Sequence, residues 1–252
     1  MKRLKFHICN SVALDAYQKT RLIFVKKIHK FICKSSQESK AAAIMTDFMP
    51  LFDYIERKSS VKISEDERDL IMTKLKPKKL RKRQYFLQEG DVCKYMGFIV
   101  KGATRMFAVD HKGHEHILHF GLEDWWVGDY ESFYLLTPSK YFVEALEEVD
   151  MLLVTNEQLQ ELDRTIPAIS AMVDSLNRGA NIANNKRMHA AISFTAEERY
   201  EDLARRYPHF FQRFPQNMIA SYLGISPETL SRIRKMAVRP NTLSHPSAKK
   251  ST

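Results

Sequence analysis

The chain has 252 residues, of which 44% are hydrophobic and 28% are charged, and its formal net charge at pH 7 is +10. This length and composition are ordinary for a globular protein of one to three domains. No run of about 18 apolar residues occurs, so we expect no transmembrane helix and no membrane partner. The three cysteines, Cys9, Cys33 and Cys93, do not suggest a disulfide framework and predict a reducing cytoplasm.

The positive charge gathers at the two ends of the chain. Residues 1–44 carry a net charge of +8 and residues 194–252 carry +5, whereas residues 45–193 carry −3. Residues 1–44 lack an apolar period, which favours a disordered arm or an upstream extension; a basic arm that contacts phosphates is the alternative. Only the excess of positive charge in residues 194–252 coincides with a binding motif.

The next segment predicts helices followed by a β-rich region. Residues 47–57 and 64–75 have the apolar spacing of helices, and Ser64 with Glu67 forms a capping box at the start of the second. From Lys78 to Val154, short β-like runs alternate with glycines and turn residues. This regular spacing predicts a sandwich or barrel-like roll, whose core can be solid or hollow.

Two further helices are expected after the β-rich region. Residues 156–163 form a short one, and Pro167 opens a long one that reaches about Ala191. Apolar and small residues recur along the long helix at alternating spacings of three and four, which predicts a dimer seam; packing onto the roll is the alternative. The seam consists of Ile169, Met172, Leu176, Gly179, Ala183, Lys186 and Ala190.

The C-terminal stretch "RFPQNMIASYLGISPETLSRIRKM" has the pattern of a helix–turn–helix. Gly224 allows the sharp turn, Ser226 is an N-cap, and Pro227 takes the first helical position. The second helix would bury Leu230 and Ile233. Its other face carries Glu228, Ser231, Arg232 and Lys235.

This polar face suits the major groove of duplex DNA. Arginine can donate two hydrogen bonds to guanine, and glutamate can accept one from the cytosine amine. Lys235, Arg234 and the flanking Arg213 are better suited to phosphates, which fix position rather than sequence. The alternative is a surface helix with solvated charges.

A β-roll, a long helix and this motif together resemble the Crp/Fnr family of bacterial transcription regulators. The stretch "FLQEGDVCKYMGFIVKGATRMFAVDHKGHEHILHF" resembles the family's cyclic-nucleotide-binding-like roll. "EERYEDLARRYP" followed by "IASYLGISPETLSRIRK" resembles the variant common in Bacteroidota. The resemblance implies a homodimer on double-stranded DNA that could also contact RNA polymerase. It assigns Glu228, Thr229 and Arg232 to bases, and Ser226 and Lys235 to phosphates.

The resemblance also points to a pocket for a small-molecule effector. Family members that bind a cyclic nucleotide use Gly-Glu and then Arg-Ser, in which the arginine pairs with the phosphate. Here Gly128-Asp129 and Ser139-Lys140 stand at those places, so the phosphate clamp is missing as a motif. An effector other than cyclic AMP, or none, is expected. Its candidate contacts are Trp126, Gly128, Asp129, Ser139, Lys140 and Tyr141.

The sequence gives weaker support to a metal-binding protein or an iron–sulfur sensor. The histidines between His111 and His119 could hold a metal in a cupin-like protein or enzyme, but surface histidines of a hairpin explain them better. An iron–sulfur sensor needs about four cysteines, more than the chain has. We therefore expect no cofactor, no metal site and no catalytic residue.

The sequence thus predicts an α+β fold: an N-terminal β-roll (jelly-roll-like) sensor domain, a long dimerisation helix and a C-terminal helix–turn–helix domain. The expected division is a leader (1–44), the roll with flanking helices (45–163), the dimerisation helix (164–193), the helix–turn–helix domain (194–240) and a tail (241–252).

Overall fold

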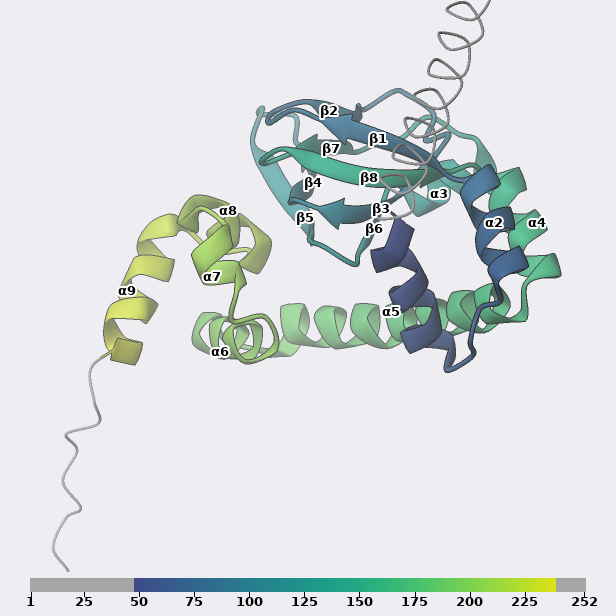
Figure 1. The fold of residues 1–252 in the computed structure, drawn as a ribbon. Helices are drawn as coiled ribbons and strands as arrows, with labels where there is room; N and C mark the ends of the chain where they lie inside the picture. The colour runs from purple at the N-terminus through teal and green to yellow at the C-terminus, as the bar shows by residue number, and fades with distance from the viewer. Residues whose placement is uncertain (1–47, 239–252) are drawn as a thin grey trace, which may run out of the picture. The chain divides into compact units, whose positions relative to one another are not determined.

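The structure is a computed structural model that describes residues 48–238 (Figure 1). Backbone contacts divide the chain into two compact units, Met1–Met49 and Pro50–Thr252. The predicted leader over 1–44 and tail over 241–252 lie outside the described residues. Within the described part, no helix combines the length and apolarity needed to cross a bilayer.

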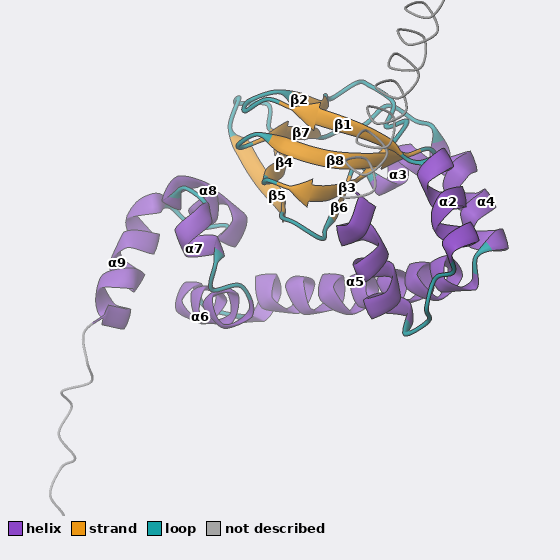
Figure 2. Cartoon of the chain, in the orientation of Figure 1, coloured by secondary structure: helices purple, strands orange, loops and turns teal. Residues whose placement is uncertain are grey.

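The strands of the described residues form two antiparallel sheets of four, and together these make the β-roll (Figure 2). The strand order is β1-β8-β3-β6 in one sheet and β2-β7-β4-β5 in the other. Apolar side chains from both sheets, such as Ile99 and Met151 of the first and Ala145 of the second, form an almost fully buried cluster. The strands are β1 (Lys76–Leu80), β2 (Tyr85–Leu87), β3 (Met96–Lys101), β4 (Thr104–Val109), β5 (Glu115–Gly121), β6 (Trp126–Val127), β7 (Phe142–Ala145) and β8 (Val149–Val154).

Helices flank the roll and make up the C-terminal region. The order of elements confirms the predicted α+β class, with a β-roll, a long helix and a C-terminal helix–turn–helix. The helices are one over residues 48–59, α2 (Glu65–Lys74), α3 (Tyr130–Leu135), α4 (Asn156–Thr165), α5 (Pro167–Ser193), α6 (Ala196–Arg206), α7 (Phe210–Arg213), α8 (Gln216–Leu223) and α9 (Pro227–Val238).

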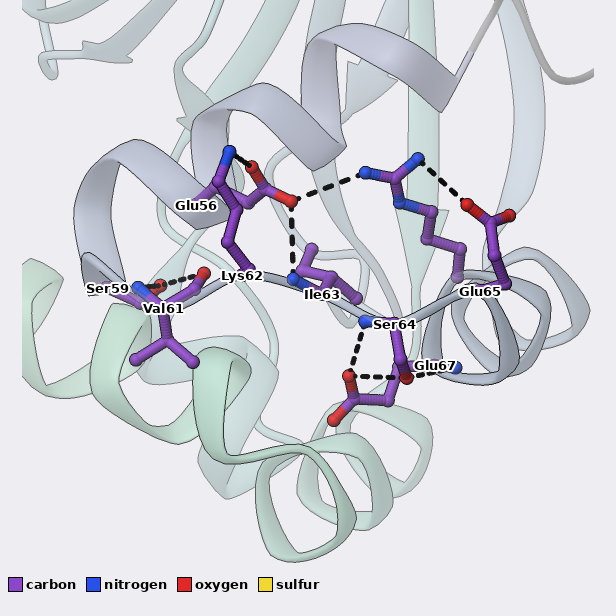
Figure 3. Close-up of polar contacts among 9 residues, drawn as sticks. Glu56, Ser59, Val61, Lys62, Ile63, Ser64, Glu65 and Glu67 are labelled. Carbon is purple, nitrogen blue, oxygen red and sulfur yellow. Dashed lines mark hydrogen bonds and ion pairs between the residues drawn. The ribbon is translucent and has the colours of Figure 1, made fainter.

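The capping box predicted at the start of α2 is present (Figure 3). The backbone N–H of Glu67 donates to the Ser64 hydroxyl, and the Glu67 carboxylate accepts from the backbone N–H of Ser64 at 2.8 Å. The Glu56 carboxylate holds the preceding turn by accepting from the backbone N–H of Ile63. Two of the helix's otherwise unpaired N-terminal donors are thus satisfied reciprocally.

The histidines between His111 and His119 lie on a hairpin, as expected, and a tight turn joins its strands β4 and β5. Gly113 adopts φ +82°, a conformation that favours glycine, and its N–H donates to the Asp110 carbonyl at 2.9 Å. The Asp110 carboxylate accepts from the backbone N–H groups of Lys112 and His114, which closes the loop.

Helix α3, which lies between β6 and β7, was not predicted. It begins at the N-cap Asp129, whose carboxylate accepts from the backbone N–H of Glu131 at 3.1 Å. It ends at Leu136 in the left-handed conformation. A capping side chain ahead of "YESFYLL" was the sequence signal for this helix.

Helix α5 runs from Pro167 to Ser193, close to the predicted bounds. The predicted dimer seam along it needs correction in its first half. Ile169 and Met172 are 3% and 1% exposed within the single chain, so they cannot face a partner. In this half, packing within the chain is the correct interpretation. Exposed apolar residues instead occur later on α5, at Ile182 and Ile192.

Candidate functional site

Helix α9 is built as the sequence predicts. Gly224 ends α8 in the left-handed conformation with φ +67°. The Ser226 hydroxyl then accepts from the backbone N–H of Thr229 at 3.2 Å and caps the new helix, with Pro227 at its first position. Leu230 and Ile233 are 0% and 3% exposed and fix α9 on the neighbouring helices. Turn, cap and buried residues together hold the helix in one orientation.

The opposite face of α9 carries the polar side chains. Glu228, Arg232 and Lys235 are exposed to solvent, and their spacing of four and three residues places them on one side of the helix. Thr229 and Ser231 are half-buried beside them. A charged row of this kind can meet the edges and phosphates of a DNA groove.

Glu228 stays ionised at neutral pH. Its own backbone N–H, at the first turn of α9, donates to the carboxylate and lowers its pKa, and the Ser226 hydroxyl adds to this effect. The carboxylate is therefore a hydrogen-bond acceptor only, which matches a base amine and disfavours a phosphate.

Arg213, which the sequence assigned to a phosphate, is held within the chain. Its guanidinium donates to Glu123 at 2.8 Å and also pairs with Glu147. These two carboxylates, Glu123 first, raise the pKa of Arg213. The assignment to a phosphate stays a prediction, and in this conformation the two carboxylates compete with a phosphate for the guanidinium.

Helix α8 packs on the edge strand β5 of the roll. The Ser221 hydroxyl accepts from the backbone N–H of Ile117 at 3.0 Å and donates to the Glu115 carbonyl at 3.1 Å. Beside it, the rings of Phe120 and Phe214 stack with centroids 4.0 Å apart. The motif and the roll therefore share one hydrophobic core.

A cavity of about 540 Å³ lies between the roll and α5. This volume is typical of a small-molecule site. Phe120 and Trp125 line it and also contact the core of the C-terminal helices, so the cavity and the DNA-binding motif have a wall in common. Its lining consists of Thr104, Met106, His119, Phe120, Gly121, Trp125, Trp126, Val127, Gly128, Tyr130, Val143, Asn177, Ala180, Asn181 and Asn184.

Of the six predicted effector contacts, Trp126 and Gly128 line this cavity and the other four do not. The carboxylate of Asp129 caps α3 and accepts from the Ser139 hydroxyl at 2.8 Å. Lys140 is exposed, and Tyr141 is half-buried. Asp129 and Ser139 thus satisfy each other inside the protein, where family members grip a phosphate.

Three asparagines of α5 reach the cavity, although they were not among the predicted contacts. Asn177, Asn181 and Asn184 follow the spacing of four and three residues that defines one helix face. The Tyr130 hydroxyl donates to the Asn177 side-chain oxygen at 3.3 Å. This asparagine stripe in "NRGANIANN" was the signal that could have identified them.

The histidines of the β4–β5 hairpin do not gather around a metal position. Ring nitrogens of His114 and His116 lie 3.3 and 3.0 Å from the same oxygen of Asp110. The hydrogen bond from His116 is the largest cause that lowers the pKa of Asp110. Among residues 48–238, no group of three or more histidine, cysteine or acidic side chains could hold an ion.

Comparison with known proteins agrees with this architecture. A family model described as "Cyclic nucleotide-binding domain" matches residues 77–165. The anaerobic regulatory protein of Haemophilus influenzae is 26% identical over 182 residues, which cover 67% of this chain and 68% of that protein. The transcriptional activator protein anr of Pseudomonas aeruginosa is 26% identical over 184 residues, which cover 67% of this chain and 72% of that protein.

Solved structures agree as well. The structure of FixK2 from Bradyrhizobium japonicum has a TM-score of 0.53 at 20% identity and covers 64% of this chain and 83% of that one. At this identity the likeness concerns the fold alone. The family model and the relatives together support a regulator of the Crp/Fnr family. The chain is a DNA-binding transcription regulator of the Crp/Fnr type, since its relatives are regulators and not enzymes.

The likeness to Crp/Fnr regulators also bears on the alternatives left open by the sequence. Crp/Fnr regulators bind DNA and act as dimers. The cupin-like alternative would require the hairpin histidines to form a metal site, whereas His114 and His116 both turn to Asp110. The specific resemblance to Bacteroidota members stays a prediction.

Proposed function

We propose that this Crp/Fnr regulator acts as a homodimer that places α9 of each copy in the major groove. Glu228, Thr229 and Arg232 would meet base edges, and Ser226 and Lys235 would meet phosphates, with Ser231 beside them. The supporting observation is the exposed row on α9, opposite the buried Leu230 and Ile233. Such a regulator would work on chromosomal DNA in the cytoplasm.

The dimer would form along the later part of α5. Ile182 and Ile192 are 57% and 79% exposed, which is unusual for large apolar side chains and favours a partner surface. Two copies joined here could present two recognition helices about 34 Å apart, one DNA turn.

The proposal includes the domain division that the sequence predicts. Residues 45–163 would sense, residues 164–193 would dimerise and residues 194–240 would bind DNA. The cavity lies against the first two segments, and its wall contacts the third through Phe120 and Trp125. A ligand that fits one arrangement of this wall better than another would shift the population of DNA-binding conformations.

Two variants of α9 test the assignment of base and phosphate contacts. Arg232→Ala should relax base discrimination by about 1–3 kcal/mol at its position, and Lys235→Ala should weaken binding equally on all sequences. Fluorescence anisotropy on an operator and its single-base variants measures both. Equal losses on all sequences for Arg232→Ala would contradict its assignment to a base.

A further inference from the structure

The cavity between the roll and α5 is electrically neutral. Among the described residues that line it, none is a lysine, arginine, aspartate or glutamate. An anion placed there would lose its water without gaining a countercharge, which is strongly unfavourable. A cyclic nucleotide carries such an anion in its phosphate.

Charged groups near the cavity already have partners or point elsewhere. Asp129 is paired with Ser139, and Lys140 is exposed outside the lining. Arg187 of α5 donates to the backbone carbonyl of Leu118, and its guanidinium lies 4.6 Å from the centre of the Tyr222 ring. None of these side chains is placed to clamp a phosphate.

His119 adds no charge either. Burial, followed by the neighbouring Arg187, lowers its pKa to about 4. The residue keeps more than a third of its surface exposed, so water moderates this effect. An unperturbed histidine is already mostly neutral at pH 7, and a lowered pKa makes it more so.

The cavity instead offers neutral hydrogen-bonding groups and aromatic faces. Thr104, Tyr130 and the three asparagines of α5 supply hydroxyls and amides, and Phe120 and Trp125 supply rings. Trp126 also lines the cavity, but its indole N–H is sealed from solvent inside the protein, so Trp126 offers a ligand its ring rather than its N–H.

We propose that this cavity binds a small uncharged ligand with a planar ring and polar groups, and that cyclic nucleotides are not its ligands. The planar ring would lie against the aromatic side chains, and its polar groups would form hydrogen bonds with the hydroxyls and amides of the lining. The inference deepens the proposed function, because the ligand's effect on DNA rests on it. Binding to the cavity can be measured without DNA.

The chain carries its own reporter for this experiment. Its two tryptophans, Trp125 and Trp126, both line the cavity, so tryptophan fluorescence responds to occupancy. The full chain would be titrated with matched neutral and anionic probes: adenosine and cyclic AMP, guanosine and cyclic GMP, benzamide and benzoate. We expect the neutral member to bind at least about tenfold more tightly in each pair that binds. Equal or tighter binding of the anions overturns the proposal, as does failure of every neutral probe at millimolar concentration.

Two variants locate the binding. Asn181→Ala removes an amide from the lining, so affinity for the neutral probe should fall about tenfold, with both tryptophans kept as reporters. Lys140→Ala should leave that affinity unchanged. Thermal melting of both variants shows whether each is folded. If cyclic AMP binds tightly and Lys140→Ala abolishes that binding, Lys140 acts as a phosphate clamp. This result would overturn the proposal.

The test separates this inference from the proposed function. Neutral probes that bind the full chain while DNA binding fails would leave the ligand assignment standing and refute the proposed function. Sequence-specific DNA binding together with a preference for cyclic AMP over adenosine would refute the ligand assignment and leave the proposed function standing.

Discussion

The hydroxyl of Ser139 donates a hydrogen bond of 2.8 Å to the carboxylate of Asp129, and both residues are at most 5% exposed. This bond joins the start of α3 to the segment before β7. It occupies two groups that stand where family members bind a cyclic nucleotide. The pair therefore stabilises the fold at a place where the family can bind a ligand.

Ser139→Ala tests this structural role. The substitution leaves one oxygen of the buried Asp129 carboxylate without its partner, which should lower the free energy of unfolding by about 1–3 kcal/mol. Urea denaturation measures the change. Lys140→Ala, an exposed neighbour, should change it by less than about 0.5 kcal/mol. Equal effects of the two substitutions would contradict the role of the pair.

Arg213 and Lys235 should differ in how they affect the salt dependence of DNA binding. Lys235 is exposed on α9, so Lys235→Gln should reduce the slope of log K against log salt by about 0.9 if it meets one phosphate. Arg213 is paired with Glu123 and Glu147, so Arg213→Gln should leave the slope unchanged. A salt series by fluorescence anisotropy gives both slopes. A reduced slope for Arg213→Gln would mean that this arginine leaves its acidic partners to contact DNA.

Ile192 should be needed for self-association. Its side chain is 79% exposed on α5, and an arginine there would bring a charge into the proposed dimer interface. We expect Ile192→Arg to raise the dimer dissociation constant at least about tenfold, as measured by analytical ultracentrifugation. Val61→Arg is the matched control, because Val61 is also an exposed apolar residue but precedes α2. Unchanged self-association of Ile192→Arg would place the interface elsewhere.

The histidine in the cavity predicts a dependence of stability on pH. Its folded-state pKa is lowered towards about 4, below the value of about 6.5 in an unfolded chain. The neutral form is thus favoured by folding, so this contribution is complete above pH 6.5 and is lost as pH falls towards 4. Urea denaturation at several pH values should show a shallower loss for His119→Gln over this window. NMR titration with a midpoint for His119 at or above 6.5 would contradict the prediction.

Local signals made the C-terminal motif predictable. Gly224, Ser226 and Pro227 act through backbone conformation and capping within a few residues, and the structure places each as the sequence indicated. The capping box at Ser64 and the hairpin turn at Gly113 were predictable for the same reason. Each of these features depends on neighbours in the sequence rather than on the tertiary fold.

The cavity was not predictable in this way, because its members come from distant segments. His119 of β5 and Asn177 of α5 meet only after the roll and the long helix have packed together. The ion pairs of Arg213 likewise depend on tertiary structure, since Glu123 and Glu147 belong to the roll. For Ile169 and Met172, a heptad-like spacing was compatible with a partner helix and with the chain's own core, and burial within the chain decided between them.

Selection of duplexes from a random DNA library by the full chain tests the central claim most directly. A dimeric regulator that reads the major groove with α9 should enrich an inverted repeat whose half-site centres are about 10 base pairs apart. Arg232→Ala should lose preference at one symmetric pair of positions in that repeat. Recovery of unenriched sequence, or of a single half-site without its inverted copy, would contradict the account.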